Sequence, residues 1–133
     1  CTLRSWLNRE FLNTAFTDKE QQRIETVTVE AECIHFTDTN DTQDKVFVLD
    51  DEEVEKYFIT TAERICIPTE KAVSEGAYVD KNHDSGCLWW LRTGSVSMPN
   101  FVYAVDTDGS FDDDGFPVTA SLVVRPAIVL RLD

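Results

Sequence analysis

The sequence contains few basic residues and no long apolar run, and each absence excludes a class of partner. Lysine and arginine together number 12 against 25 aspartates and glutamates, which gives a net charge of −13. Such an excess of negative charge repels phosphate backbones and anionic lipid surfaces, so we do not expect nucleic acid as a partner. No stretch reaches the roughly 18 consecutive apolar residues that indicate a membrane-spanning helix. We therefore expect no membrane insertion.

The sequence also lacks the short motifs that accompany common catalytic sites. It has no G-x-S-x-G nucleophile elbow and no glycine-rich phosphate loop. Its cysteines, Cys1, Cys33, Cys66 and Cys87, are widely spaced and form no C-x-x-C pair. An even number of cysteines permits two disulfides in any of three connectivities, and four separate thiols are the alternative. The sequence leaves this choice open, and we expect no enzymatic activity.

The chain has 133 residues and an apolar fraction of 42%, which together predict one globular domain over 1–133. Because the sequence opens on Cys1 without an initiator methionine, we expect this domain to be part of a longer chain or of a processed one. A mature lipoprotein, which would also begin with cysteine, is one such processed form.

Helical patterns fill most of the first half of the chain. Apolar residues recur at every fourth position and predict an amphipathic helix with one stripe, Leu3, Leu7, Phe11 and Ala15. Thr17 and Glu20 form a capping box ahead of a second short helix, and Asp50 is the expected N-cap of a helix over 51–58. The pattern of 68–76 predicts a further helix.

Strand patterns dominate from position 77 onward. Short apolar runs at 88–91, 101–105, 116–118 and 122–130 are separated by Gly, Asn, Asp and Ser, which is typical of antiparallel strands joined by loops. Earlier in the chain, alternation over 24–33 and the run 45–49 predict two more strands, with a loop at 37–44. The expected class is therefore α+β, with helices in the first half and short antiparallel strands with long loops in the second.

Five motifs in this order carry a family resemblance: "WLNREFLNTAF", "DKVFVLDDEEVEKYF", "WWLRTG", "AVDTDGS" and "VVRPAIVL". They resemble an uncharacterised bacterial domain family with the fingerprint W-L-N-x-x-F-L-N-x-A-F, W-W-L-R-S, V-D-x-D-G and V-R-P-A. Its closing half is similar to C-type lectin-like domains, including formylglycine-generating-enzyme-like domains. The resemblance implies a C-type lectin-like fold in which Trp89 or Trp90 closes the core with Trp6 and Phe101. It further implies that Arg92 and Arg125 satisfy buried carbonyls or carboxylates near the sheet ends.

In lectin-like relatives the exposed loops carry binding, which here points to loops 93–121. Tyrosine, serine and asparagine combine rigid contact area with adaptable hydrogen bonding on such surfaces. The predicted ligand-binding residues are Trp89, Ser95, Ser97, Asn100, Tyr103, Asp112 and Asp113. The functional hypothesis is a non-enzymatic recognition module that binds a protein or a glycan, as part of a bacterial secreted or cell-surface protein. Its acidity favours a basic or neutral partner.

Alternating carboxylates in "DTDGSFDDDG", 106–115, offer oxygen ligands of the kind that calcium prefers. The candidate metal ligands are Asp106, Asp108, Asp112 and Asp114, and a calcium-stabilised carbohydrate-binding domain is the first alternative function. The alternative structure for this stretch is a β-hairpin, because an Asp-Gly pair flanked by apolar residues is a strong turn signal. Sugar binding of the C-type lectin kind is disfavoured because Met98, in "MPN", cannot serve as a calcium ligand.

A zinc site and an enzyme are the two remaining alternatives. Cys33, His35, His83 and Cys87 are residue types that bind zinc, although their spacing is unusual. An enzyme related to the formylglycine-generating branch would need a cysteine pair near the end of the chain. No cysteine follows Cys87, so that activity is the weaker alternative.

Overall fold

The computed structural model describes the whole chain apart from residues 1, 31–40, 83, 113 and 133. The described residues fall into two compact units, of which the first holds 2–30, 41–48 and 126–132 and the second holds 49–125. The prediction of one domain over 1–133 stays a prediction.

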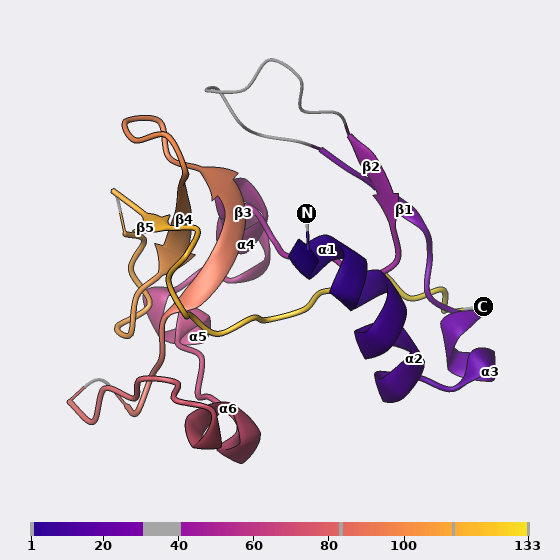
Figure 1. The fold of residues 1–133 in the computed structure, drawn as a ribbon, viewed down its shortest axis with the longest axis horizontal. Coiled ribbons are helices and arrows are strands. Elements are labelled where there is room, and N and C mark those ends of the chain that lie inside the picture. Colours follow the sequence, from indigo (N-terminus) through magenta and orange to yellow (C-terminus); the bar gives the residue numbers. More distant parts are fainter. Residues whose placement is uncertain (1, 31–40, 83, 113, 133) are drawn as a thin grey trace. The chain divides into compact units, whose positions relative to one another are not determined.

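The first unit begins with a continuous helical rod, drawn in indigo in Figure 1. It consists of α1 (Thr2–Trp6), the π-helical segment η1 (Leu7–Phe11) and α2 (Leu12–Ala15), so the predicted helix is confirmed. The predicted stripe is wrong in its second half, because Ala15 is exposed and Leu12 is buried together with Leu7. A π-helical turn bonds residues five apart, and it therefore shifts the buried face by one position.

The rod is followed by α3 (Asp18–Gln21), which has the predicted capping box. The Thr17 side chain accepts from the Glu20 backbone N–H, and the Glu20 carboxylate accepts from the Thr17 N–H at 2.7 Å. The bond from the Thr17 N–H, and after it one from the Thr17 hydroxyl at 3.0 Å, favour the charged carboxylate and lower the pKa of Glu20.

Two short strands complete the first unit, β1 (Val27–Val29) and β2 (Thr42–Asp44), and they pair antiparallel. The prediction of a loop over 37–44 is therefore wrong for 42–44, while 37–40 lie outside the described residues. Residues 45–49 are mostly buried as predicted, but Phe47 makes only an isolated bridge, to Ala127. The predicted strand at 122–130 likewise appears only as isolated bridges.

Asn8 ties the rod to the segment after β2. Its Oδ1 accepts from the backbone N–H groups of Lys45 and Val46 at 2.9 and 3.0 Å. Its Nδ2 donates to the carbonyl of Val46 at 2.8 Å and to that of Arg4 at 3.1 Å. The Arg4 guanidinium pairs with the buried Asp44 carboxylate at 2.9 Å. The asparagine of the W-L-N motif thus has a structural role, because its side chain bonds the backbone of Lys45 and Val46 as a neighbouring strand would.

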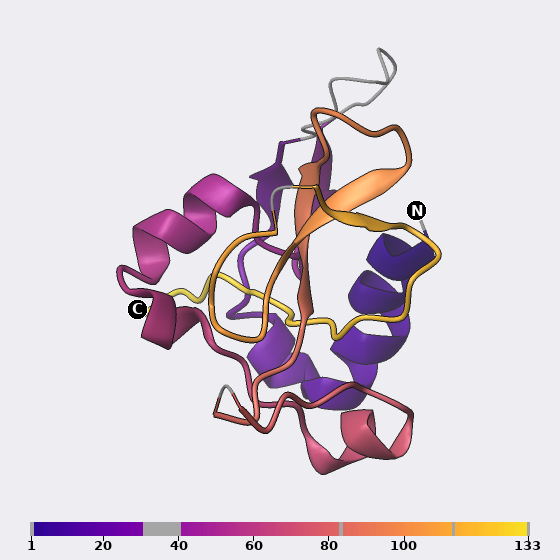
Figure 2. The ribbon, with the colours of Figure 1, turned by 90° about the vertical axis from the view of Figure 1, so that its left-hand side faces the viewer.

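In the second unit, three helices precede a three-stranded sheet along the chain (Figures 1 and 2). The helices are α4 (Asp51–Tyr57), α5 (Thr61–Arg64) and α6 (Glu70–Ser74). The strands are β3 (Trp89–Gly94), β4 (Phe101–Val105) and β5 (Phe116–Pro117), antiparallel in the order β3-β4-β5. The predicted α+β class is confirmed. Asp50 caps α4 as predicted, with Glu53 completing a capping box.

The core of the second unit forms around β3. Trp89, Leu91 and Thr93 alternate toward the buried side, and Trp90 and Arg92 toward the half-exposed side, as the period of a strand requires. Ala104 and Val105 of β4 and Val54 of α4 are also buried. No described helix is long and apolar enough to cross a membrane.

Candidate functional site

The start of α4 is fastened to β3 by a cluster of charged and polar side chains. The Arg92 guanidinium lies 3.0 Å from the Asp50 carboxylate and 2.8 Å from that of Glu53. The Thr93 hydroxyl accepts from the Asp51 N–H at 3.0 Å. Burial raises the pKa of Asp50 more than its hydrogen bond with Glu53 and the nearby Arg92 lower it. The predicted role of Arg92, satisfying buried carboxylates, is confirmed, and this cluster holds the strand that leads into the loop surface.

Arg125 is held by aromatic rings. Its guanidinium lies 4.8 Å from the ring centre of Phe58 and 4.9 Å from that of Trp89, distances at which cations and rings attract. Its buried Nη1 has no hydrogen-bond partner among the described residues. The prediction that Arg125 satisfies a carbonyl or carboxylate is therefore wrong for this nitrogen.

Trp89 is a core residue and is not available as a ligand contact. Its side chain is fully buried, and its Nε1 donates to the Arg64 carbonyl at 3.0 Å. The prediction that Trp89 contacts a ligand directly is wrong for this reason, while Trp89 is the one of the two adjacent tryptophans that fills the core. Trp6, predicted to share that core, is 43% exposed and contacts Phe11 at 5.5 Å between ring centres.

The loop after β3, residues 95–100, is folded by Ser95. This serine is 1% exposed, and its hydroxyl accepts from the N–H groups of Ser97 and Met98 at 3.4 and 3.3 Å. Its own N–H donates to the Phe101 carbonyl at 2.9 Å. Asn100 takes the left-handed conformation (φ 63°), which asparagine tolerates better than most residues. Ser95, predicted to bind ligand, is instead the buried side chain that shapes the loop.

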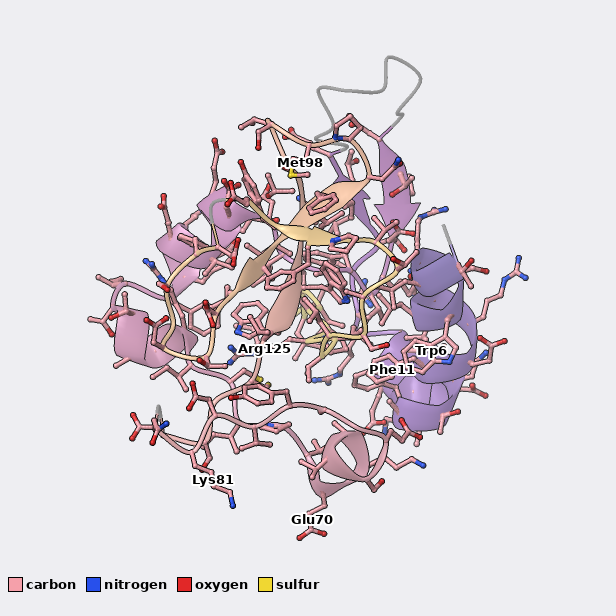
Figure 3. All side chains as sticks on the ribbon, turned by 60° about the vertical axis from the view of Figure 1, so that its left-hand side comes forward. Trp6, Phe11, Glu70, Lys81, Met98 and Arg125 are labelled. Carbon is pink, nitrogen blue, oxygen red and sulfur yellow. The ribbon has the colours of Figure 1, made fainter. Side chains whose placement is uncertain are left out.

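The same loop exposes apolar side chains beside β5. Val96 is 60% exposed, Met98 41% and Val118 57%. The Val118 N–H donates to the Asn100 carbonyl at 3.0 Å, which places the end of β5 against the loop. Figure 3 shows Met98 at the loop end of the sheet and Arg125 near the other end. We call Val96, Met98, Asn100 and Val118 the tip surface.

Sequence reasoning selected Asn100 and Ser97 in this region but missed the apolar members of the tip surface. Isolated valines in a strand-rich sequence are usual core residues, and no pattern separated Val96 and Val118 from those. Tyr103, also predicted to bind ligand, is half-exposed, and its hydroxyl oxygen lies 3.5 Å from the Val96 N–H, which donates to it. It therefore supports the loop from β4.

The acidic stretch 106–115 forms turns. Val105 and Phe111 pair antiparallel and the Asp106 N–H donates to the Ser110 carbonyl at 2.7 Å, so the hairpin alternative is confirmed. The Asp108 carboxylate accepts from the Ser110 N–H, and that of Asp112 accepts from the N–H groups of Asp114 and Gly115. Each carboxylate thus serves its own turn.

The predicted calcium ligands do not assemble into a site. Across the described ranges, no three His, Cys, Asp or Glu side chains lie together in a way that could hold a metal ion. Asp106, Asp108, Asp112 and Asp114 are all described, so the prediction that they share a metal is wrong. Asp113, predicted to bind ligand, lies outside the described residues, as do Cys33, His35 and His83 of the proposed zinc set. The remaining member of that set, Cys87, is buried.

A family model described as "Domain of unknown function (DUF6273)" matches residues 1–132. The chain belongs to this family. That agrees with the resemblance to an uncharacterised domain family, and the DUF6273 match covers nearly the whole chain. No curated protein and no solved structure matches the DUF6273 chain.

Proposed function

We propose that this DUF6273 domain is a non-enzymatic recognition module that binds a partner through loops 93–121. The observation that supports the proposal is the tip surface, where Val96 and Met98 are exposed on a loop folded by the buried Ser95 and Val118 is exposed on the segment bonded to that loop. Exposed apolar side chains on loops held by a rigid scaffold are typical of binding surfaces. A C-type lectin-like arrangement of the second unit, as part of a secreted or surface protein, belongs to the same proposal.

Between the two predicted classes of ligand, the tip surface favours a protein over a glycan. Valine and methionine side chains offer no hydrogen bonds to sugar hydroxyls. Methionine is enriched at protein interfaces and adapts its shape to different partners. A peptide segment with apolar side chains fits this surface, and basic or neutral flanking residues suit a chain of net charge −13.

The cysteine chemistry supports a non-enzymatic role. A nucleophilic cysteine needs a lowered pKa and an accessible thiolate. Burial, followed by the neighbouring Cys66, raises the pKa of Cys87 to about 12, and the side chain is buried. At neutral pH its thiol is therefore protonated, which disfavours Cys87 as a catalytic nucleophile.

The test is selection of binders from a random peptide library, with a glycan array run in parallel. Selected ligands are then measured against a variant carrying Val96→Ser, Met98→Ser and Val118→Ser. The control is Ile59→Ser, which removes a side chain that is 80% exposed in the same unit. We expect peptides whose affinity falls at least about tenfold in the tip variant and is unchanged in the control. Ligands that bind the tip variant as tightly as the wild type would overturn the proposed surface, and binders found only on the glycan array would overturn the protein preference.

A further inference from the structure

Two segments of the second unit that are distant in sequence run side by side just before β3. Cys66 and Cys87 form an isolated antiparallel bridge, and the Cys87 N–H donates to the Cys66 carbonyl at 2.8 Å. Two residues before Cys66 and two residues after Cys87, the segments are joined again, because the Trp89 Nε1 donates to the Arg64 carbonyl at 3.0 Å. These two ties fix the register of 64–66 against 87–89.

This register brings the two thiols together. Residues that face each other in an antiparallel bridge have their side chains on the same face, with Cα atoms about 4.5–5.5 Å apart. Disulfides span Cα distances of about 4.4–6.8 Å, so two residues that are bridged in this way are expected to lie within the required range. The Cys87 Sγ lies 3.1 Å from the Cys66 carbonyl oxygen, and the Cys66 side chain is close enough to raise the pKa of the Cys87 thiol.

We propose that Cys66 and Cys87 form an intramolecular disulfide when the domain meets a small-molecule disulfide such as oxidised glutathione. The cysteines are both free thiols in the structure, which is the reduced form. The assignment selects one bond from those that four cysteines permit, and it does not depend on the proposed binding function.

The chemistry is thiol–disulfide exchange in two steps. The partly exposed Cys66 thiolate attacks glutathione disulfide, forming a mixed disulfide and releasing one glutathione thiolate. The Cys87 sulfur then loses its proton to solvent, attacks the Cys66 sulfur and releases the second glutathione. Two protein thiols are oxidised and one glutathione disulfide is reduced to two thiols. Because burial holds the Cys87 thiol protonated, the second step requires this thiol to lose its proton first.

The bond would close a chain loop between residues 21 positions apart that contains α6. Closing a loop reduces the freedom of the unfolded chain and stabilises the folded form. The bond would also fasten the segment after α5 to the start of β3, where Trp89 and the guanidinium of Arg125 meet.

The experiment equilibrates the folded full chain in a series of reduced-to-oxidised glutathione ratios, blocks free thiols by alkylation and digests with trypsin. Cleavage after lysine and arginine places Cys66 on the peptide 65–71 and Cys87 on 82–92, while Cys1 and Cys33 fall on two other peptides. We expect one cross-linked species, 65–71 joined to 82–92, and a melting midpoint several degrees higher in the oxidised chain. The same link should form in a Cys1→Ser, Cys33→Ser variant.

Two further variants test the order of steps. Cys87→Ser should stop at a glutathione adduct on Cys66, and Cys66→Ser should leave Cys87 unmodified. Oxidation in denaturant is the reference for random pairing, and there we expect mixed links. The proposal is overturned if the folded chain shows no 65–71 to 82–92 link at the most oxidising ratio, or if it shows the same mixture of links as the denatured chain. Since the wild type and the Cys1→Ser, Cys33→Ser variant both report the link, the result does not depend on whether Cys87→Ser folds.

Discussion

Replacement of Asn8 by alanine tests whether one side chain holds the helical rod of the first unit to the segment after β2. Three of its hydrogen bonds cross to the backbone of Lys45 and Val46, at 2.9, 3.0 and 2.8 Å. Each such bond contributes about 1 kcal/mol net, and Val46 is fully buried, so water cannot replace the lost partners. We expect Asn8→Ala to lower the free energy of unfolding by about 3 kcal/mol.

The measurement is urea denaturation followed by far-UV circular dichroism, and the rod supplies its own control. Asn13 lies one and a half turns further along, and its exposed side chain accepts only a long hydrogen bond from Gln21, at 3.3 Å. Asn13→Ala should therefore cost less than about 0.5 kcal/mol. Equal losses for the two variants, or a loss below about 1 kcal/mol for Asn8→Ala with an unchanged m-value, would refute the structural role given to Asn8.

Two further predictions concern the second unit. Gly109 and Gly76 both have positive φ, but only at Gly109 would a Cβ meet backbone, 1.9 Å from the Thr61 carbonyl oxygen. Gly109→Ala should therefore lower the melting midpoint well beyond Gly76→Ala, and equal midpoints would contradict this close approach. Burial raises the pKa of Asp50, so the folded chain binds a proton on this carboxylate more tightly than the unfolded chain does. The stabilisation from proton binding is therefore full below the pKa of the unfolded chain. It is lost as the pH rises through the pKa of the folded chain. The stability of the wild type relative to Asp50→Asn should therefore decrease as the pH rises through that window, and a difference that grows with pH in urea titrations would show that pairing with Arg92 outweighs burial.

Local signals in the sequence predicted the parts of the fold that depend on neighbouring residues. The capping boxes at Thr17 and Asp50 need partners only three positions away, and both form as predicted. The turn at 106–110 depends on Asp-Gly, and its hairpin also forms. Such features are short-range, so a single sequence carries all the information that determines them.

The features that sequence reasoning missed depend on residues far apart in the chain. Nothing near Thr42–Asp44 indicates a strand, because its polar residues become a strand only by pairing with β1. The π-helical segment has no local signature either, and after Leu7 the next buried residue is Leu12 rather than Phe11 of the predicted stripe. The aspartates of 106–114 match the composition of a calcium loop, but the carboxylates of Asp106, Asp108 and Asp112 accept hydrogen bonds from the backbone of their own turns. Composition therefore predicted ligand types that the backbone does not bring together.

The adjacent tryptophans show why the binding residues were mispredicted from the sequence. A strand directs consecutive side chains to opposite faces, so only one of Trp89 and Trp90 can fill the core, and the sequence did not determine which. The structure buries Trp89, and with it Leu91 and Thr93, so that the alternation continues to Ser95 on the buried side. The buried Ser95 hydroxyl accepts hydrogen bonds from the backbone of the loop, and the next residue, Val96, is exposed to solvent. The burial pattern that includes Trp89 thus continues to Ser95, and the tip surface, which shares only Asn100 with the residues chosen from the sequence, is the surface that we propose binds a partner.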